Sequence, residues 1–183
     1  MLLRIVIGLL TLLYPIAVYL GLQTFDARYL VVLLLVVAAA RLFTLDSKSP
    51  LNHWLWLPLL LLLAIWSWLT NSALGLKFYP VLVNACLLIF FAWSLKVPPS
   101  MIERFARLKD PDLPERGIHY TRQVTAVWCG FFIINGTIAL LTALYASDAL
   151  WAAYNGFIAY IAMGTLFAGE WLIRQRVMKA HHD

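Results

Sequence analysis

Charged residues are scarce in this sequence, making up 13% of its 183 residues against the about 25% that is typical of soluble domains. Apolar residues make up 63%, and the mean hydropathy is +0.82. A soluble core of this size cannot bury that much apolar surface. The composition therefore excludes an ordinary soluble domain and predicts a membrane protein.

Cysteine and histidine are also rare, and catalytic motifs are missing. Cys86 and Cys129 lie inside apolar stretches, which excludes a disulfide framework and a zinc site. No zincin, nucleophile-elbow, P-loop or dinucleotide motif occurs. We predict no metal and no cofactor, and the lack of an acid pair or a histidine within the apolar stretches argues against an enzyme. The four histidines fall in expected loops or at the tail: His53, His119, His181 and His182.

Six apolar stretches remain, each about long enough to cross a bilayer as a helix. They lie at about 2–22, 29–45, 54–69, 79–95, 124–145 and 150–173. The first resembles a signal peptide, but Tyr14-Pro15 interrupts it and no A-x-A-like cleavage site follows, so we count it as a span. The prediction is an all-α polytopic membrane protein, a single transmembrane domain of six helices over residues 1–183.

The basic residues fall almost entirely in alternate gaps between these stretches. Only Arg28 and Lys77 lie on one side, and the other 12 of the 14 lie opposite. The majority are Arg4, Arg41, Lys48, Lys96, Arg104, Arg107, Lys109, Arg116, Arg122, Arg174, Arg176 and Lys179. The positive-inside rule then places both termini in the cytoplasm. Because the cations cluster beside spans, we expect anionic lipid headgroups as partners and no nucleic acid.

One cytoplasmic loop, residues 96–122, carries half of those cations. Pro98-Pro99 cannot continue the fourth span, and Ser100 with Glu103 matches a capping box. A short amphipathic helix is predicted from Met101 to about Lys109, lying on the cytoplasmic leaflet between the fourth and fifth spans.

This loop has two interpretations. It can be a connector held at the membrane by lipid, or a docking surface for a soluble partner. Its acidic residues, at positions 110, 112 and 115, suit a protein better than an anionic membrane. The predicted docking residues for partner or lipid are Arg104, Arg107, Lys109 and Arg116.

Polar side chains inside spans are costly unless paired. Asn84, Asn135 and Asn155 fall in the fourth, fifth and sixth spans, and with Tyr154 and Tyr160 they can form a neutral hydrogen-bonding pocket for a polar headgroup or a phenolic group. The alternative is that each asparagine only joins helices through an interhelical hydrogen bond.

Two further patterns occur in the sixth span. Glu170 and Arg174 are spaced for an ion pair at the cytoplasmic interface, with a proton relay by Glu170 as the alternative. Four small residues recur at multiples of four and would let a second helix approach, either from the same chain or from another copy. They are Ala152, Gly156, Gly164 and Ala168.

Several short motifs resemble an uncharacterised family of bacterial inner-membrane proteins. They are Phe78–Asn84, Pro98–Arg104, Gly117–Arg122, Val127–Phe132, Asn135–Gly136, Tyr154–Gly156 and Gly169–Trp171. That family is associated with gene clusters for aryl-polyene or xanthomonadin-type pigments. A more distant resemblance, in 128–132 and 151–157, is to the intracellular septation protein A family.

The resemblance implies a bacterial inner-membrane location and cytoplasmic biosynthetic enzymes as partners. We therefore expect an accessory or scaffold protein for envelope-lipid or aryl-polyene assembly that docks those partners through residues 96–122. One alternative is a transporter or flippase for an amphiphile that uses the asparagine pocket. Another is a small lipid-modifying membrane enzyme.

Overall fold

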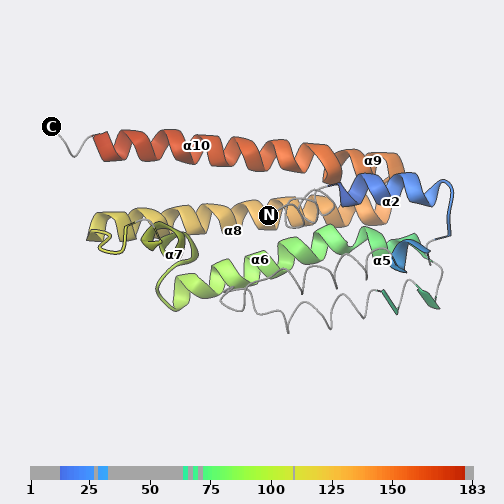
Figure 1. The fold of residues 1–183 in the computed structure, drawn as a ribbon, viewed down its shortest axis with the longest axis horizontal. Coiled ribbons are helices and arrows are strands. Elements are labelled where there is room, and N and C mark those ends of the chain that lie inside the picture. The colour runs from blue at the N-terminus through green and yellow to red at the C-terminus, as the bar shows by residue number, and fades with distance from the viewer. Residues whose placement is uncertain are drawn as a thin grey trace. The chain divides into compact units, whose positions relative to one another are not determined.

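The computed structural model describes residues 13–26, 29–32, 64–65, 68–69, 72–108 and 110–179. Every regular element in these ranges is helical, in agreement with the all-α prediction, and Figure 1 shows them in chain order from blue to red. The elements are α2 (Tyr14–Leu22), α5 (Ala73–Lys77), α6 (Tyr79–Lys96), α7 (Met101–Arg107), α8 (Glu115–Tyr145), α9 (Asp148–Ala153), the π-helical turn η1 (Tyr154–Ile158) and α10 (Ala159–Lys179).

Three helical stretches in the described ranges are long and apolar enough to cross a membrane. They run over Ala73–Lys96, Glu115–Tyr145 and Asp148–Gln175, with 24, 31 and 28 residues. At about 1.5 Å per residue each exceeds the roughly 30 Å of a hydrocarbon core. They cover the predicted fourth, fifth and sixth spans. Most of the first three predicted spans lies outside the described residues.

The loop between α6 and α8 is shorter than the predicted 96–122, because α8 begins at Glu115. Pro114 directly precedes the helix, and an acid in the first turn suits the positive end of the helix dipole. Gly117 lies within this helix and does not mark a flexible turn. A Cβ on Gly117 would lie 2.9 Å from the Leu113 side chain, so the missing side chain leaves room for that leucine.

The predicted sixth span is also less regular than a single α-helix. It begins as α9, widens into η1 and continues as α10. Asn155, inside η1, donates its side-chain N–H to the carbonyl of Trp151 at 2.9 Å. A side chain that binds the carbonyl four residues earlier competes with the helical ladder, a known cause of such local distortion.

Tertiary contacts divide the chain into two compact units, residues 1–80 with 139–158 and residues 81–138 with 159–183. The core of the first includes Tyr14, Val18, Leu76 and Trp151. The core of the second is aromatic. Phe91 of α6 packs edge-on against Phe132 of α8, with 5.1 Å between the ring centroids. The ring centroids of Trp128 in α8 and Phe167 in α10 are 4.5 Å apart.

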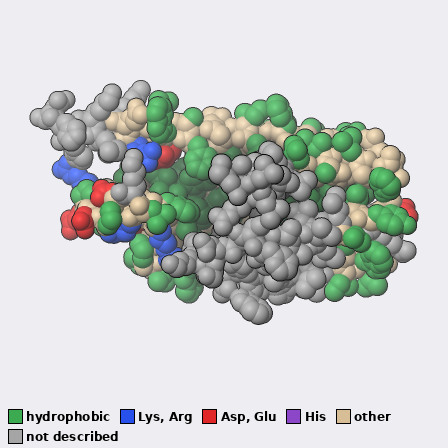
Figure 2. Space-filling view, in the orientation of Figure 1, with side chains coloured by type: hydrophobic (Ala, Val, Ile, Leu, Met, Phe, Trp, Pro, Cys, Tyr) green, Lys and Arg blue, Asp and Glu red, His purple; other side chains and the backbone are tan. Residues whose placement is uncertain are grey.

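Surface chemistry separates the apolar flanks of the helices from one charged region. Large apolar side chains are exposed along α6, α8 and α10, among them Ile89, Ile133, Ile134, Ile161 and Phe167. Charged side chains gather over α7 and the start of α8 on the face drawn in Figure 2. This distribution suits helix flanks that face lipid and a loop that faces water.

Candidate functional site

The break between α5 and α6 lies at Phe78, two residues before Pro80. Proline has no backbone N–H, so the Leu76 carbonyl four residues earlier loses its helical donor. The hydroxyl of Tyr14 donates to that carbonyl at 3.2 Å. The indole N–H of Trp151 donates to the next carbonyl, that of Lys77, also at 3.2 Å. Both bonds are buried, so side chains replace water where the helix is interrupted.

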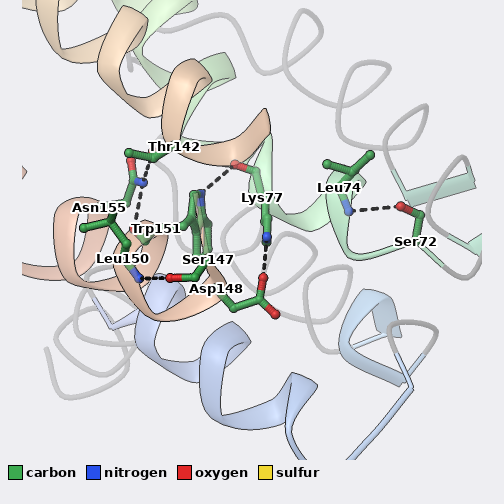
Figure 3. A network of polar contacts seen from close by, with 9 residues as sticks. All are labelled: Ser72, Leu74, Lys77, Thr142, Ser147, Asp148, Leu150, Trp151 and Asn155. Carbon is green, nitrogen blue, oxygen red and sulfur yellow. Dashed lines mark hydrogen bonds and ion pairs between the residues drawn. The ribbon is translucent and has the colours of Figure 1, made fainter. Parts of the chain in front are cut away.

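An ion pair lies at the same break. The ammonium of Lys77, the last residue of α5, pairs with the carboxylate of Asp148, the first residue of α9 (Figure 3). The lysine side chain is 9% exposed and the aspartate side chain 49%. We call Tyr14, Leu76, Lys77, Asp148 and Trp151 the kink site.

Asn155 extends this polar network to the end of α8. Besides the Trp151 carbonyl, its amide donates to the Thr142 hydroxyl at 3.2 Å, as Figure 3 shows. Ser147 caps α9 by accepting from the Leu150 N–H at 3.3 Å. The observed contacts of Asn155 are therefore those of a residue that joins α8 to η1.

The other two asparagines meet each other. Asn135 of α8 donates to the side-chain oxygen of Asn84 in α6 at 3.0 Å, and both side chains are buried. The adjacent Gly136 allows the approach, since a Cβ there would lie 3.0 Å from the Cβ of Asn84. Tyr154 and Tyr160, the other members of the predicted pocket, are half-buried in η1 and α10. The described contact of Asn84 and Asn135 joins two apolar helices.

α7 is fixed in place by hydroxyl groups from its neighbours. The Met101 N–H donates to Ser94 of α6 at 2.9 Å, and the Ile102 N–H donates to Thr125 of α8 at 3.3 Å. Both hydroxyls are buried. First-turn N–H groups have no partner within their own helix, so these bonds satisfy donors that would otherwise need water.

The predicted capping residues of α7 are in place, although only one half of the box meets strict hydrogen-bond geometry. The Ser100 N–H donates to the Glu103 carboxylate at 3.2 Å. The Ser100 hydroxyl is buried and makes no hydrogen bond within the described ranges. The Glu103 half therefore carries the cap in this structure.

Two of the predicted docking arginines form contacts with other residues of the same loop. Arg107 pairs with the buried Glu103 at 2.9 Å and donates to the Pro111 carbonyl at 2.9 Å. Arg104 donates to the Pro99 carbonyl at 2.9 Å. Arg116 is exposed on α8, and Lys109 lies outside the described residues. Arg107 is thus a structural residue of the loop as well as a charged one.

The apolar face predicted for this helix is split. Met101 is buried and Ile102 packs against the same core, whereas Phe105 is exposed and Leu108 is 83% exposed. Half of the face anchors α7, and the other half stays open. We call residues 97–114 the α7 loop and Phe105 with Leu108 its open apolar pair.

Glu170 lies between two partners. Its carboxylate is 3.9 Å from Arg174, at the long end for an ion pair, and accepts from the Tyr120 hydroxyl at 3.3 Å. Tyr120 also donates to the Glu170 backbone carbonyl at 3.3 Å. These contacts hold the start of α8 against α10, and they give Glu170 a structural role through a tyrosine that sequence patterns do not indicate.

The four small residues of the sixth span are not equivalent. Ala152 is buried, and a Cβ on Gly156 would lie 2.9 Å from Ile16 of α2. Ala168 is exposed, and nothing described lies within 4 Å of a Cβ on Gly164. The first two therefore pack within the chain, and only the last two leave space for another helix.

The kink site is the main feature that the sequence predictions did not include. The one sequence feature that points to it is Pro80, three residues after Lys77, at the start of an apolar stretch. The described ranges contain no group of three or more His, Cys, Asp or Glu side chains placed to hold a metal ion. No known protein family, curated protein or solved structure matches this chain.

Proposed function

We propose that this chain is an accessory protein of the bacterial inner membrane, with six spans and both termini in the cytoplasm. On this topology the α7 loop faces the cytoplasm and docks a soluble partner. The one-sided distribution of 12 of the 14 basic residues supports the orientation. The three long apolar helices support the membrane location.

The observation that carries the docking role is the open apolar pair on an anchored helix. A seven-residue helix is too short to be stable alone in water. α7 is instead held by Ser94, Thr125 and the buried Met101. A fixed position lowers the entropy lost on binding, and this is how a preformed binding surface gains affinity.

The charges around α7 favour a protein as the occupant over the lipid surface. Exposed acids directly follow the helix and would be repelled by anionic headgroups: Asp110, Asp112 and Glu115. Arg116 is exposed beside them. The fitting partner has an apolar groove for Phe105 and Leu108 and a rim of mixed charge. The family resemblance suggests an enzyme of envelope-lipid or aryl-polyene assembly.

The test is a photocrosslinking amino acid placed at Leu108 of the full chain in its native membrane, with Ile133 as the matched control. Both positions are exposed and apolar, but Ile133 lies in the middle of α8. We expect a soluble-protein adduct at position 108 and only lipid adducts at position 133. Phe105→Ser should reduce the protein adduct at least fivefold, and Gln123→Ala, at an exposed residue of α8, should not.

Two results would sink the docking proposal. One is that position 108 gives only lipid adducts, which would make the loop a lipid-bound connector. The other is a protein adduct that Phe105→Ser leaves unchanged, because chance proximity does not depend on the open apolar pair.

Transport of an amphiphile is the alternative, and its pocket requires free carboxamides. The hydrogen bond between Asn84 and Asn135 supports helix packing as their use. For this reason we place the accessory function first.

A further inference from the structure

The charged residues of the α7 loop differ in whether their charge is already matched within the chain. Glu103 is buried, and one of its carboxylate oxygens pairs with the guanidinium of Arg107 at 2.9 Å. The other oxygen accepts from the Ser100 N–H at 3.2 Å. If Arg107 turned to an external partner, it would leave a buried carboxylate without its counter-charge, which is costly. Arg107 is therefore committed to its own loop.

Arg104 is also directed toward the loop. Its Nε donates to the Pro99 carbonyl at 2.9 Å, and its side chain is half-buried. Arg116, by contrast, is exposed in the first turn of α8. The two arginines of α7 itself are thus oriented by contacts within the chain, and the exposed charge next to the helix comes from the residues that follow it.

The residues that follow α7 are mainly acidic. Asp110, Asp112 and Glu115 are all exposed, and we call residues 110–115 the acidic segment. Residues 110–116 hold these three acids and one base, Arg116, so their net charge is −2. Acidic side chains reach the surface at the α7 end of the face drawn in Figure 2. The exposed charge beside the open apolar pair is therefore negative.

The acidic segment is held in place next to α7. Arg107 donates to the Pro111 carbonyl at 2.9 Å, and the Asp110 N–H donates to the Ala106 carbonyl at 3.0 Å. Leu108 lies two positions before Asp110, so a protein that covers the open apolar pair also meets the carboxylates. Charges fixed beside an apolar contact select among partners and steer their approach.

We propose that the partner of the α7 loop carries a cluster of lysine or arginine residues beside its apolar groove, opposite the acidic segment. This inference rests on the proposed docking function and names the chemistry of the partner. The three carboxylates would repel an acidic partner, and an uncharged rim would desolvate them without compensation. Basic residues attract them and leave the buried pair of Glu103 and Arg107 intact. They therefore form the larger part of the mixed rim.

The test measures the soluble-protein adduct of the photocrosslinking amino acid at position 108, in the full chain and its native membrane. A neutralised variant combines Asp110→Asn, Asp112→Asn and Glu115→Gln, and its adduct should be at least fivefold smaller because the attraction is lost. Arg116→Glu makes the region more negative and should raise the adduct at least twofold. Such a gain cannot come from damage to the fold. Asp26→Asn, at an exposed acid outside the loop, is the matched control and should change nothing.

The outcomes separate the basic partner from the docking function itself. If position 108 gives no protein adduct, or if Phe105→Ser leaves the adduct unchanged, the docking function fails and this inference fails with it. If Phe105→Ser removes the adduct but either charge change does not move it in the stated direction, docking stands and the basic partner is overturned. A smaller adduct after Arg116→Glu would point instead to an acidic partner.

Discussion

The kink site and the α7 loop solve the same problem in different surroundings. Each lies where a helix is interrupted and backbone groups need a partner outside the helix. In the kink site, carbonyls receive an indole N–H and a phenol O–H from distant segments. In the α7 loop, two amide N–H groups donate to the hydroxyls of Ser94 and Thr125.

The difference lies in the size of the partner side chains and in access to water. Tyr14 and Trp151 are large, buried and part of an apolar core. The α7 partners are small, and exposed charged residues directly follow the helix. Ser94 and Thr125 are themselves buried, but α7 is short and is followed by exposed residues, so it can open locally and bring its freed amides to water. The carbonyls of the kink site lie within a core, so we expect the kink site to govern stability and the α7 loop to tolerate local opening.

The largest effect is expected for Trp151→Ala. It removes a fully buried indole and its bond to the Lys77 carbonyl, so the free energy of unfolding in detergent micelles should fall by about 3–5 kcal/mol. Trp93→Ala is the matched control, since Trp93 is exposed on α6. Equal losses in the two variants would show that Trp151 does not support the kink.

Tyr14→Phe sharpens the comparison by deleting a single hydroxyl. The Leu76 carbonyl would lose its side-chain donor in an apolar core, so we expect a loss of about 1–3 kcal/mol in the same unfolding measurement. The exposed Tyr145 serves as the control, and Tyr145→Phe should change stability by less than about 0.5 kcal/mol. A neutral Tyr14→Phe would mean that water reaches the kink.

The smallest effect is expected at the α7 loop. Ser94→Ala or Thr125→Val should cost about 0.5–1.5 kcal/mol, because local opening of the short helix α7 can bring the freed amide to water. Hydrogen exchange at the Met101 and Ile102 amides should become faster, while exchange in the middle of α8 stays unchanged. Thr137→Val, at an exposed threonine bonded only within its own helix, is the control. Losses as large as that of Tyr14→Phe would remove the contrast between the two regions.

Local signals predicted the elements they act on. Pro98-Pro99 and the Ser100–Glu103 cap place the end of α6 and the start of α7, and the predicted 79–95 span corresponds to Tyr79–Lys96. The early start of α8 and the π-helical turn were not predicted. Each depends on packing or on a side-chain bond, such as Leu113 against Gly117 or Asn155 to Trp151.

The candidate sites divide in the same way. Sequence patterns select Glu170, the three asparagines and the loop arginines, because polar residues stand out in an apolar chain. They do not supply Tyr120 as a partner of Glu170. Sequence patterns do not predict the kink site, because its hydrogen bonds join residues that lie 62 and 74 positions apart in the chain.

Hydropathy and charge by themselves determined the helical class, the apolar stretches and the loop with most of the charge, since these are sums over residues along the chain. Only the tertiary structure decided the partners: Lys77 with Asp148, Asn84 with Asn135, and Trp151 with the Lys77 carbonyl. A hydrogen bond or ion pair requires two groups within about 3–4 Å, and that proximity is set by how helices pack.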